Sequence, residues 1–281
     1  MKKPIDKIRR IGLIGNPEKP ECDALLRQAA LRIKRTGRRA VFDADVAALA
    51  RRTDLLLVFG GDGTMLRAAR EIAGAPTPLL GINLGSLGFL TAVPADELPR
   101  ALRQVWSGEF HFEERALLQV SGHAKGLAFD KTALNDAVVS RGPVSRLIGL
   151  DVSVDAEPVT HYRCDGLIVS SPTGSTAYSL AAGGPAIFPT AAVIVVTPIC
   201  PHALSNRPLI LPLDAAIRIQ PAHPKLATTF LNVDGQSVAE LGAGDEVTIR
   251  RSRRGVRLMH LAGESFWKTL RHKLHWRGAA L

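Results

Sequence analysis

The sequence predicts an α/β domain with a small parallel sheet, followed by a domain made mainly of β-strands. Residues 55–59 (LLLVF) are apolar without alternation, which is typical of a parallel strand buried on both faces. Segments with strand and helix patterns alternate up to about residue 106, as they do around parallel sheets. From about residue 113 the apolar runs become short and closely spaced, which is typical of antiparallel sheets.

The α/β part predicts a flavodoxin-like or Rossmann-like layer. We expect strands at residues 8–15, 39–42, 55–59 and 79–83, and helices at 23–36, 64–73 and 95–106. Gly37 and Gly74 are placed to end the first two helices. The glycine-rich segment 83–91 (NLGSLGFLT) should lie at the carboxyl ends of the strands, where open α/β sheets bind their ligands.

The second part predicts eight short strands and a final helix. The strands are expected at residues 116–120, 132–140, 147–154, 166–170, 192–197, 217–220, 229–233 and 247–250. Residues 265–276 place Phe266, Leu270 and Leu274 on one helical face, and we interpret the remaining basic face as solvated.

Composition narrows the class of protein. The chain has 281 residues, long enough for two modest domains, and 36 Lys or Arg against 26 Asp or Glu give a net charge of +10. That charge favours anionic partners such as nucleotides, but aromatic residues make up only 5% and do not interleave with basic blocks, which argues against a dedicated nucleic-acid module. Three widely spaced cysteines indicate a reducing cytoplasm. The short apolar run after the basic start predicts neither a signal peptide nor a membrane span.

The segment GGDGT at residues 60–64 follows the central strand and predicts a phosphate-binding turn. Glycines at 60, 61 and 63 permit positive φ and close approach of a phosphate, and Thr64 can cap the next helix, whose N-terminus favours anions. The spacing fits neither a Walker loop nor G-x-G-x-x-G. Asp62 could accept a proton from an attacking hydroxyl, bind a ribose hydroxyl, hold a metal, or simply stabilise the turn. Arg67, one turn further on, could reach a pyrophosphate or face solvent.

A second candidate stretch is RCDGLIVSSPTGSTAYSLAAGGP at residues 163–185. Its hydroxyls and backbone amides suit a polar planar ligand, and Tyr178 can stack on it or donate a hydrogen bond. The alternative is a Ser/Thr-rich surface loop. Asn135 and Asp136 offer an acceptor pair for ribose hydroxyls, or else form a turn. Among the whole sequence no cluster of His, Cys and Asp predicts a protein cage for a metal.

These motifs together resemble the NAD kinase family. The resemblance rests, in order, on GGDGT, NLGSLGFLT, LND at 134–136, DGLIVSSPTGSTAYSLAAGGP at 165–185, TPICPHALSNRPLI at 197–210 and DGQ at 234–236. The first motif is shared with lipid and sugar kinases, whereas the fourth is far more specific. The resemblance implies an α/β domain of residues 1–112 completed by a returning C-terminal helix (258–281), a β-sandwich-like domain of residues 113–257, and an active site between them.

The resemblance also implies roles for individual residues. Asp62, beside Gly63, matches the proton acceptor for the adenosine ribose 2′-hydroxyl of NAD, and Asn135 and Asp136 match the pair that grips the adenosine side. Position 136 is often Glu in relatives. The loop around the dinucleotide corresponds to Thr176, Ala177, Tyr178, Ser179, Leu180 and Ala181. Further NAD contacts, some across a subunit interface, correspond to Arg146, Arg163, Asp165 and Gln236. His202 is assigned a structural role.

The expected activity is therefore transfer of the ATP γ-phosphoryl group to NAD, giving NADP. ATP and NAD are the substrates, magnesium accompanies the nucleotide, and the enzyme is expected to be a cytoplasmic homo-oligomer without membrane or specific nucleic-acid partners. A lipid or sugar kinase would keep Asp62 but leave residues 163–185 unexplained. A non-catalytic dinucleotide sensor or a basic nucleic-acid binder would leave Asp62 unexplained.

Overall fold

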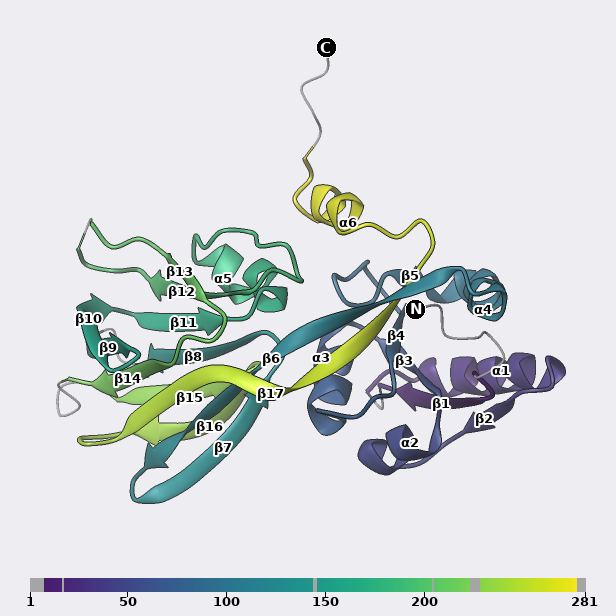
Figure 1. The fold of residues 1–281 in the computed structure, drawn as a ribbon, viewed down its shortest axis with the longest axis horizontal. Coiled ribbons are helices and arrows are strands. Elements are labelled where there is room, and N and C mark those ends of the chain that lie inside the picture. The colour runs from purple at the N-terminus through teal and green to yellow at the C-terminus, as the bar shows by residue number, and fades with distance from the viewer. Residues whose placement is uncertain (1–7, 17, 144–145, 204, 223–227, 277–281) are drawn as a thin grey trace, which may run out of the picture. The chain divides into compact units, whose positions relative to one another are not determined.

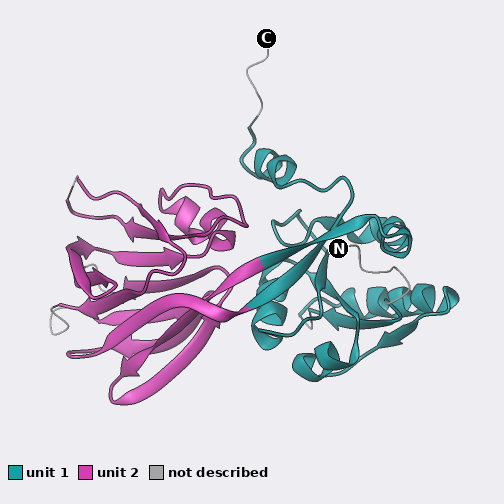
Figure 2. Ribbon diagram, in the orientation of Figure 1, with its two compact units in different colours: residues 1–114, 255–281 teal, residues 115–254 magenta. Residues whose placement is uncertain are grey.

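The computed structural model describes residues 8–16, 18–143, 146–203, 205–222 and 228–276. The chain divides into two compact units, residues 1–114 with 255–281 and residues 115–254 (Figure 2). Two long strands, β6 (Phe110–Ala124) and β17 (Glu246–Leu261), pair with each other and contribute residues to both units. Each unit is described by itself below.

Unit 1, residues 1–114 with 255–281, contains the predicted parallel sheet (Figure 1). Its strands lie in the order β4, β3, β1, β2, and all neighbours in that order are parallel. Their bounds are β1 (Arg10–Gly15), β2 (Arg39–Val41), β3 (Leu55–Gly60) and β4 (Leu79–Asn83), with the short β5 (Val93–Pro94) beside β4. Every residue of β3 is buried, because a strand pairs with it on each side and helices cover both faces of such a sheet.

The helices of unit 1 depart from the sequence prediction at two points. They are α1 (Cys22–Arg35), α2 (Val46–Arg52), α3 (Asp62–Glu71), a 3₁₀ turn η2 (Ala95–Glu97), α4 (Leu98–Ser107) and α6 (Phe266–Lys273). The seven-residue α2 was not predicted, because it is too short to show helical periodicity; the Asp45 side chain caps it by accepting from Ala48 N. Helix α3 begins at Asp62 with Gly61 as N-cap, so the prediction that Thr64 caps this helix was wrong.

Unit 2, residues 115–254, has two antiparallel layers around one core. One sheet has the order β13, β12, β11, β8, β15, β16; the other contains β10, β9, β14 and β17, with β6 and β7 paired at its side. Bounds are β7 (Leu127–Ala133), β8 (Asp136–Arg141), β9 (Ile148–Val154), β10 (Glu157–Cys164), β11 (Gly166–Ser170), β12 (Val193–Ile199), β13 (Leu209–Pro212), β14 (Ile217–Pro221), β15 (Thr229–Val233) and β16 (Gln236–Leu241). Two short turns of helix follow β11: η3 (Thr173–Thr176) and α5 (Tyr178–Ala181).

The α/β domain and the antiparallel β-sandwich confirm the predicted fold class. The final helix, expected over residues 265–276, begins one residue later and ends at Lys273, and only Leu270 of it is buried. Across the described residues, no helix has the length and apolar character needed to cross a membrane.

Candidate functional site

Asp62 lies at the first position of α3, directly after the central strand. Its Oδ1 accepts from Leu90 N at 3.0 Å, Thr91 N at 3.2 Å and Thr91 Oγ1 at 3.2 Å, while Oδ2 accepts from Phe89 N at 2.9 Å. A carboxylate has about four lone-pair positions, two on each oxygen. Oδ1 is therefore saturated by the protein, whereas Oδ2 keeps capacity for one more hydrogen bond.

Asp62 binds the glycine-rich segment 83–91. This agrees with the prediction that the segment lies at the carboxyl ends of the strands. Asn83 fixes this segment from inside by donating Nδ2 to Ser86 O at 2.7 Å and to Thr91 Oγ1 at 2.9 Å. Gly88 is essential to the approach, because a Cβ built there would lie 2.0 Å from Asp62 Oδ1. The carboxylate is thus both an anchor of this segment and a candidate catalytic group.

None of the three glycines of the phosphate turn is required by a positive φ. Gly60, Gly61 and Gly63 are absent from the left-handed region, so that part of the prediction was wrong. A Cβ at Gly60 would meet Thr64 Oγ1 at 2.2 Å, whereas one at Gly61 or Gly63 would meet nothing within 4 Å. The open space beside Gly61 and Gly63 adjoins the start of α3, where the N–H groups of the first two residues have no acceptor inside the helix and favour an anion.

Two cations stand at the carboxyl ends of the strands in this unit. Arg67 is half-buried and donates Nη2 to Gly15 O at 3.1 Å, at the end of β1, so it is not a solvent-facing side chain. Lys19 donates Nζ to Leu84 O at 3.2 Å and lies 3.5 Å from the position of a Cβ at Gly85. Sequence reasoning missed Lys19, although its place in the loop after the first strand was a usable signal.

Helix α6 contacts the segment that holds Asp62. The rings of Phe89 and Phe266 lie 6.3 Å apart between centroids, and the rings of Phe266 and Trp267 lie 5.2 Å apart. The Phe89 backbone N–H donates to Asp62 Oδ2. The C-terminal helix is therefore connected to the candidate catalytic carboxylate through one residue.

In unit 2, Asp234 holds the segment that contains Asn135 and Asp136. Its carboxylate accepts from Leu134 N at 3.0 Å, Asn135 N at 2.8 Å and Asp136 N at 3.2 Å. Asp234 and Gly235 have φ of 46° and 74° and connect β15 to β16 as the two central residues of a hairpin turn. Sequence reasoning used the DGQ motif for Gln236 but missed the anchoring role of Asp234.

Asp136 is only 5% exposed, so its carboxylate would be charged with little contact to water. Burial, followed by repulsion from the Asp234 carboxylate, raises the pKa of Asp136 to about 7. Its neighbour Asn135 is half-buried. A carboxyl group that is neutral below pH 7 can donate a hydrogen bond, which an ionised one cannot.

The serine-rich loop after β11 packs against the same segment. Ser171 Oγ donates to Leu134 O, and a Cβ at Gly174 would lie 2.2 Å from Asn135 O. Ser175 Oγ accepts from Ile187 N at 2.9 Å, and Ser179 Oγ pairs with Thr197 Oγ1 at 2.8 Å. These hydroxyls are buried and used inside the protein, so the expectation that they are presented to a ligand was wrong for the serines.

The residue that this loop mainly presents to solvent is Tyr178, which is 48% exposed. Thr176, Ala177 and Leu180 are half-buried, Ser179 is buried, and Ala181 is exposed. Gln236, just after the Asp234 turn, is exposed. The structure therefore brings Asn135, Asp136, the loop of residues 171–181 and the turn before Gln236 together in one part of unit 2.

Three other predicted residues are not part of that group. Ser170 of β11 pairs with Asp136, whereas Gly166, at the other end of β11, follows Asp165. Asp165 is five positions before Ser170, and at about 3.3 Å per residue it lies roughly 17 Å from the end of β11 that pairs with Asp136. Asp165 instead binds Arg141 Nε at 2.7 Å, while Arg163 on β10 and Arg146 are exposed. Arg141 was also missed from the sequence.

The residues that the structure describes contain no group of three or more His, Cys, Asp or Glu side chains arranged to hold a metal ion. Magnesium in nucleotide sites needs only one or two carboxylates, because substrate phosphates and waters complete its shell. The Asp62 carboxylate beside the phosphate turn has one position left, on Oδ2, which such an ion or a substrate hydroxyl could fill.

Comparison with known proteins identifies both units. The model of the ATP-NAD kinase N-terminal domain matches residues 41–110, and that of the ATP-NAD kinase C-terminal domain matches residues 134–261. NAD kinases of Ralstonia nicotianae and Moorella thermoacetica are 40% and 42% identical to this chain. The alignments cover 95% and 97% of this chain and 93% and 91% of the relatives.

Solved structures agree with this assignment. The crystal structure of yeast NADH kinase complexed with NADH superposes with a TM-score of 0.85 at 26% identity, covering 98% of this chain and 89% of that one. An NAD kinase from Archaeoglobus fulgidus in complex with ATP superposes with a TM-score of 0.77 at 25% identity, covering 96% of this chain and 100% of that one.

Proposed function

This chain belongs to the NAD kinase family, and from that premise we infer that it transfers the γ-phosphoryl group of ATP to the adenosine ribose 2′-hydroxyl of NAD. It is a phosphotransferase with ATP and NAD as substrates and NADP as product. The observation that carries the mechanism is Asp62, a carboxylate with one open oxygen at the N-terminus of the helix that follows the phosphate turn.

We propose that Oδ2 of Asp62 accepts the hydrogen of the ribose hydroxyl. Oδ1 is occupied by Leu90 and Thr91, which fixes the orientation of the carboxylate, and Oδ2 retains the capacity for one more donor. As the hydroxyl oxygen bonds to the γ-phosphorus, the bond from phosphorus to the bridging oxygen breaks and ADP leaves. The hydroxyl proton passes to Oδ2, and solvent later removes it.

The donor phosphates are proposed to lie over Gly61 and Gly63. The space beside these glycines is open, and the first N–H groups of α3 point their positive end at it. Lys19 and Arg67 supply positive charge at the ends of the neighbouring strands. A magnesium ion bound to the nucleotide would further neutralise the phosphate charge. It would be held by phosphate oxygens and waters, because the remaining position on Oδ2 of Asp62 is assigned to the ribose hydroxyl.

The NAD side of the site is proposed to lie in unit 2. Asn135 and neutral Asp136 would bind ribose or adenine atoms, and Tyr178 would stack on a base. The close packing of Gly174 against Asn135 supports a single rigid surface built from the two segments. Gln236 would contribute from the adjacent hairpin turn.

We also propose that NAD contacts come from a second copy of the chain. Arg163 and Asp165 lie at the end of β11 opposite to Asp136. Arg146 is exposed and lies two residues before Ile148, which pairs with Cys164, next to Asp165. Within one chain these residues therefore lie away from the NAD site proposed around Asp136. In a homo-oligomer they would contact the NAD bound to a neighbouring chain. Multi-angle light scattering of the active enzyme should show more than one chain per particle; a fully active monomer would disprove this arrangement.

Two further parts of the proposal concern conditions. The three cysteines are free thiols, which supports a reducing, cytoplasmic environment.

Metal dependence is tested by removing divalent ions with EDTA, which should abolish turnover until magnesium is restored.

One coupled assay tests the activity against its alternatives. The purified chain is given ATP, magnesium and, in separate arms, NAD, a diacylglycerol or a sugar phosphate, and ADP release is measured. Turnover only with NAD is the expected result, and NADP should form in equal amount. Turnover with the lipid or sugar but not NAD would reject the proposal, as would NAD binding by calorimetry without any turnover, which would indicate a sensor.

A further inference from the structure

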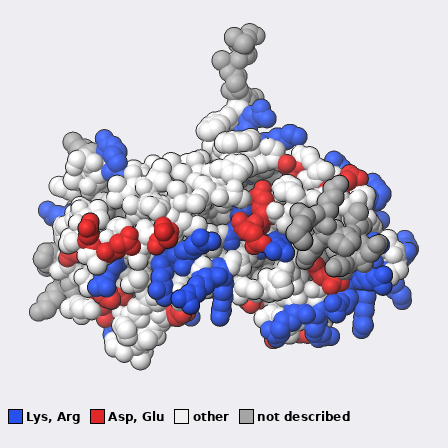
Figure 3. Space-filling view, viewed as in Figure 1, with Lys and Arg blue, Asp and Glu red and all other residues white. Residues whose placement is uncertain are grey.

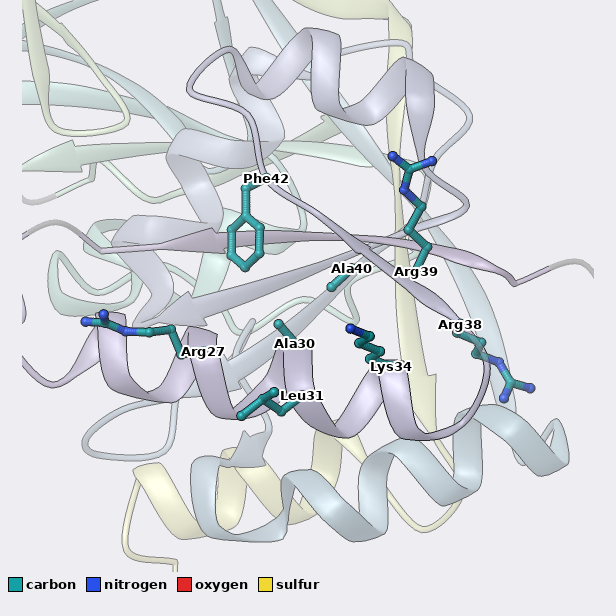
Figure 4. A pocket seen from close by; sticks show the side chains of 8 residues that line it. All are labelled: Arg27, Ala30, Leu31, Lys34, Arg38, Arg39, Ala40 and Phe42. Carbon is teal, nitrogen blue, oxygen red and sulfur yellow. The ribbon is translucent and has the colours of Figure 1, made fainter.

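A groove on the outer edge of unit 1 lies apart from the residues assigned to catalysis. It is formed by α1 and the edge strand β2, with a volume of about 570 Å³ (Figure 4). Its floor consists of the apolar residues Ala30, Leu31, Ala40 and Phe42. Leu31 and Phe42 are 59% and 54% exposed, so two large apolar side chains face solvent in one place.

Four cations border this apolar floor, namely Arg27, Lys34, Arg38 and Arg39. Figure 4 shows Lys34 reaching from α1 toward the strand, and Arg27 and Arg38 toward opposite ends of the groove. The Arg39 side chain extends the other way from β2, away from Phe42. In the described part of the chain, none of the four forms an ion pair with a carboxylate. Arg38 is engaged differently, because its guanidinium lies 3.9 Å from the centre of the Trp106 ring.

The surrounding sequence strengthens this positive charge. Residues 22–42 contain six Lys or Arg and one Asp, a formal charge of +5 within 21 residues. Figure 3 shows Lys and Arg gathered over the part of unit 1 that contains α1, α2 and β2. An apolar floor within a positive rim matches a ligand that has an apolar body and a negative group.

The geometry decides among possible occupants. A second copy related by twofold symmetry would place the same four cations against their equivalents, which is repulsive. A strand-adding peptide would find little to bond, because β2 has three residues and Arg39 already donates its backbone N–H to Arg9 O in the direction of β1. In a parallel ladder alternate residues face outward, which leaves Ala40 alone for a new strand. The volume lies in the range of small-molecule sites.

We propose that this groove binds a small amphiphilic anion, an aromatic ring or short acyl chain that carries a phosphate, sulfonate or carboxylate group. The apolar body packs on Leu31 and Phe42, and the anionic group binds Lys34, with Arg27 adding positive charge at one end of the groove. The site is independent of the NAD and ATP sites proposed above, so it stands or falls separately from the kinase activity.

The probe is 1-anilinonaphthalene-8-sulfonate, which has an aromatic body and one sulfonate. Its fluorescence is titrated against the full chain in the presence of saturating NAD, which fills the dinucleotide site. We expect saturable binding of one probe per chain that weakens as salt is raised. The double variant Arg27→Glu/Lys34→Glu should raise the Kd at least tenfold, and Phe42→Ser at least fivefold.

A matched control lies on the same helix. Arg32→Glu/Arg35→Glu makes the same change in net charge at two exposed positions that do not line the groove, and should change the Kd less than threefold. Circular dichroism and thermal unfolding confirm that each variant is folded. Equal losses in both double variants would overturn the proposal, because they would show attraction by overall charge alone.

Three other outcomes would also overturn it. Absence of saturable binding to the parent would mean that the groove holds no such ligand. Displacement of the probe by a decaglutamate peptide, with the same dependence on Arg27 and Lys34, would indicate an acidic peptide partner instead. A change from oligomer to monomer in Arg27→Glu/Lys34→Glu, without the same change in the control, would show that another copy of the chain covers the groove.

Discussion

Replacing Asp62 by Asn should stop phosphoryl transfer and also loosen the segment of residues 83–91. The amide oxygen can take the place of Oδ1 and accept from Leu90 and Thr91, but the amide nitrogen then meets the Phe89 N–H, and both are donors. Losing a hydrogen bond to a charged group costs about 1.5–3 kcal/mol. We therefore expect the free energy of unfolding of Asp62→Asn to fall by roughly 2 kcal/mol.

The effect on catalysis should be larger than the effect on stability. Loss of a general base typically lowers a rate by about 10²- to 10⁴-fold, which corresponds to roughly 3–5 kcal/mol of transition-state stabilisation. Turnover is measured with ATP, magnesium and NAD by coupled release of ADP, and NAD binding is measured by calorimetry. Binding should persist while kcat falls, because the adenosine contacts proposed above lie in unit 2.

Asn83→Ala separates the two roles of Asp62. Asn83 fixes the same segment through Ser86 O and Thr91 Oγ1 but has no proposed contact with substrate, so this variant loosens the segment while the carboxylate remains. Its stability should fall by a similar amount, whereas its kcat should fall less than tenfold. The reasoning would be refuted if Asp62→Asn kept turnover within a few-fold of the parent, or if Asn83→Ala lost as much activity as Asp62→Asn.

Three other variants test separate parts of the site. Tyr178→Ala should raise the KM for NAD by about 5- to 150-fold, from a stacking loss of about 1–3 kcal/mol, and change that for ATP much less; equal effects on both would count against stacking. The pKa of Asp136 is raised by burial to about 7, so the native state holds this proton between about pH 4 and 7 while the unfolded chain has released it. The free energy of unfolding of the parent should therefore fall as pH rises across that window, by on the order of 4 kcal/mol in all. Asp136→Asn should lack this fall when the two proteins are compared by urea titration at pH 5 and 7.5. Phe266→Ala removes the ring that contacts Phe89 and should lower kcat with little change in either KM; an unchanged kcat would mean that α6 does not support the segment that holds Asp62.

Local chemistry in the sequence determined the main elements and the position of the catalytic candidate. The uninterrupted apolar run of residues 55–59 required burial on both faces, and hence a central position, which β3 occupies with complete burial. The glycines and the acid at its end required a turn at the start of a helix, where Asp62 lies. Strand spacing in the second half was enough to predict antiparallel sheets, because side-chain alternation depends only on neighbours along the chain.

Only the tertiary structure decided which groups meet, because hydrogen bonds across long separations leave no periodic signal in a sequence. Asp62 accepts from residues 27 to 29 positions later, and Asp234 from residues about 100 positions earlier. The same long-range packing turned the loop serines inward, since Ser171 and Ser179 find partners on other segments. It also separated Asp165 from Asp136, because Asp136 of β8 pairs with Ser170 at one end of β11, whereas Asp165 precedes the other end of β11.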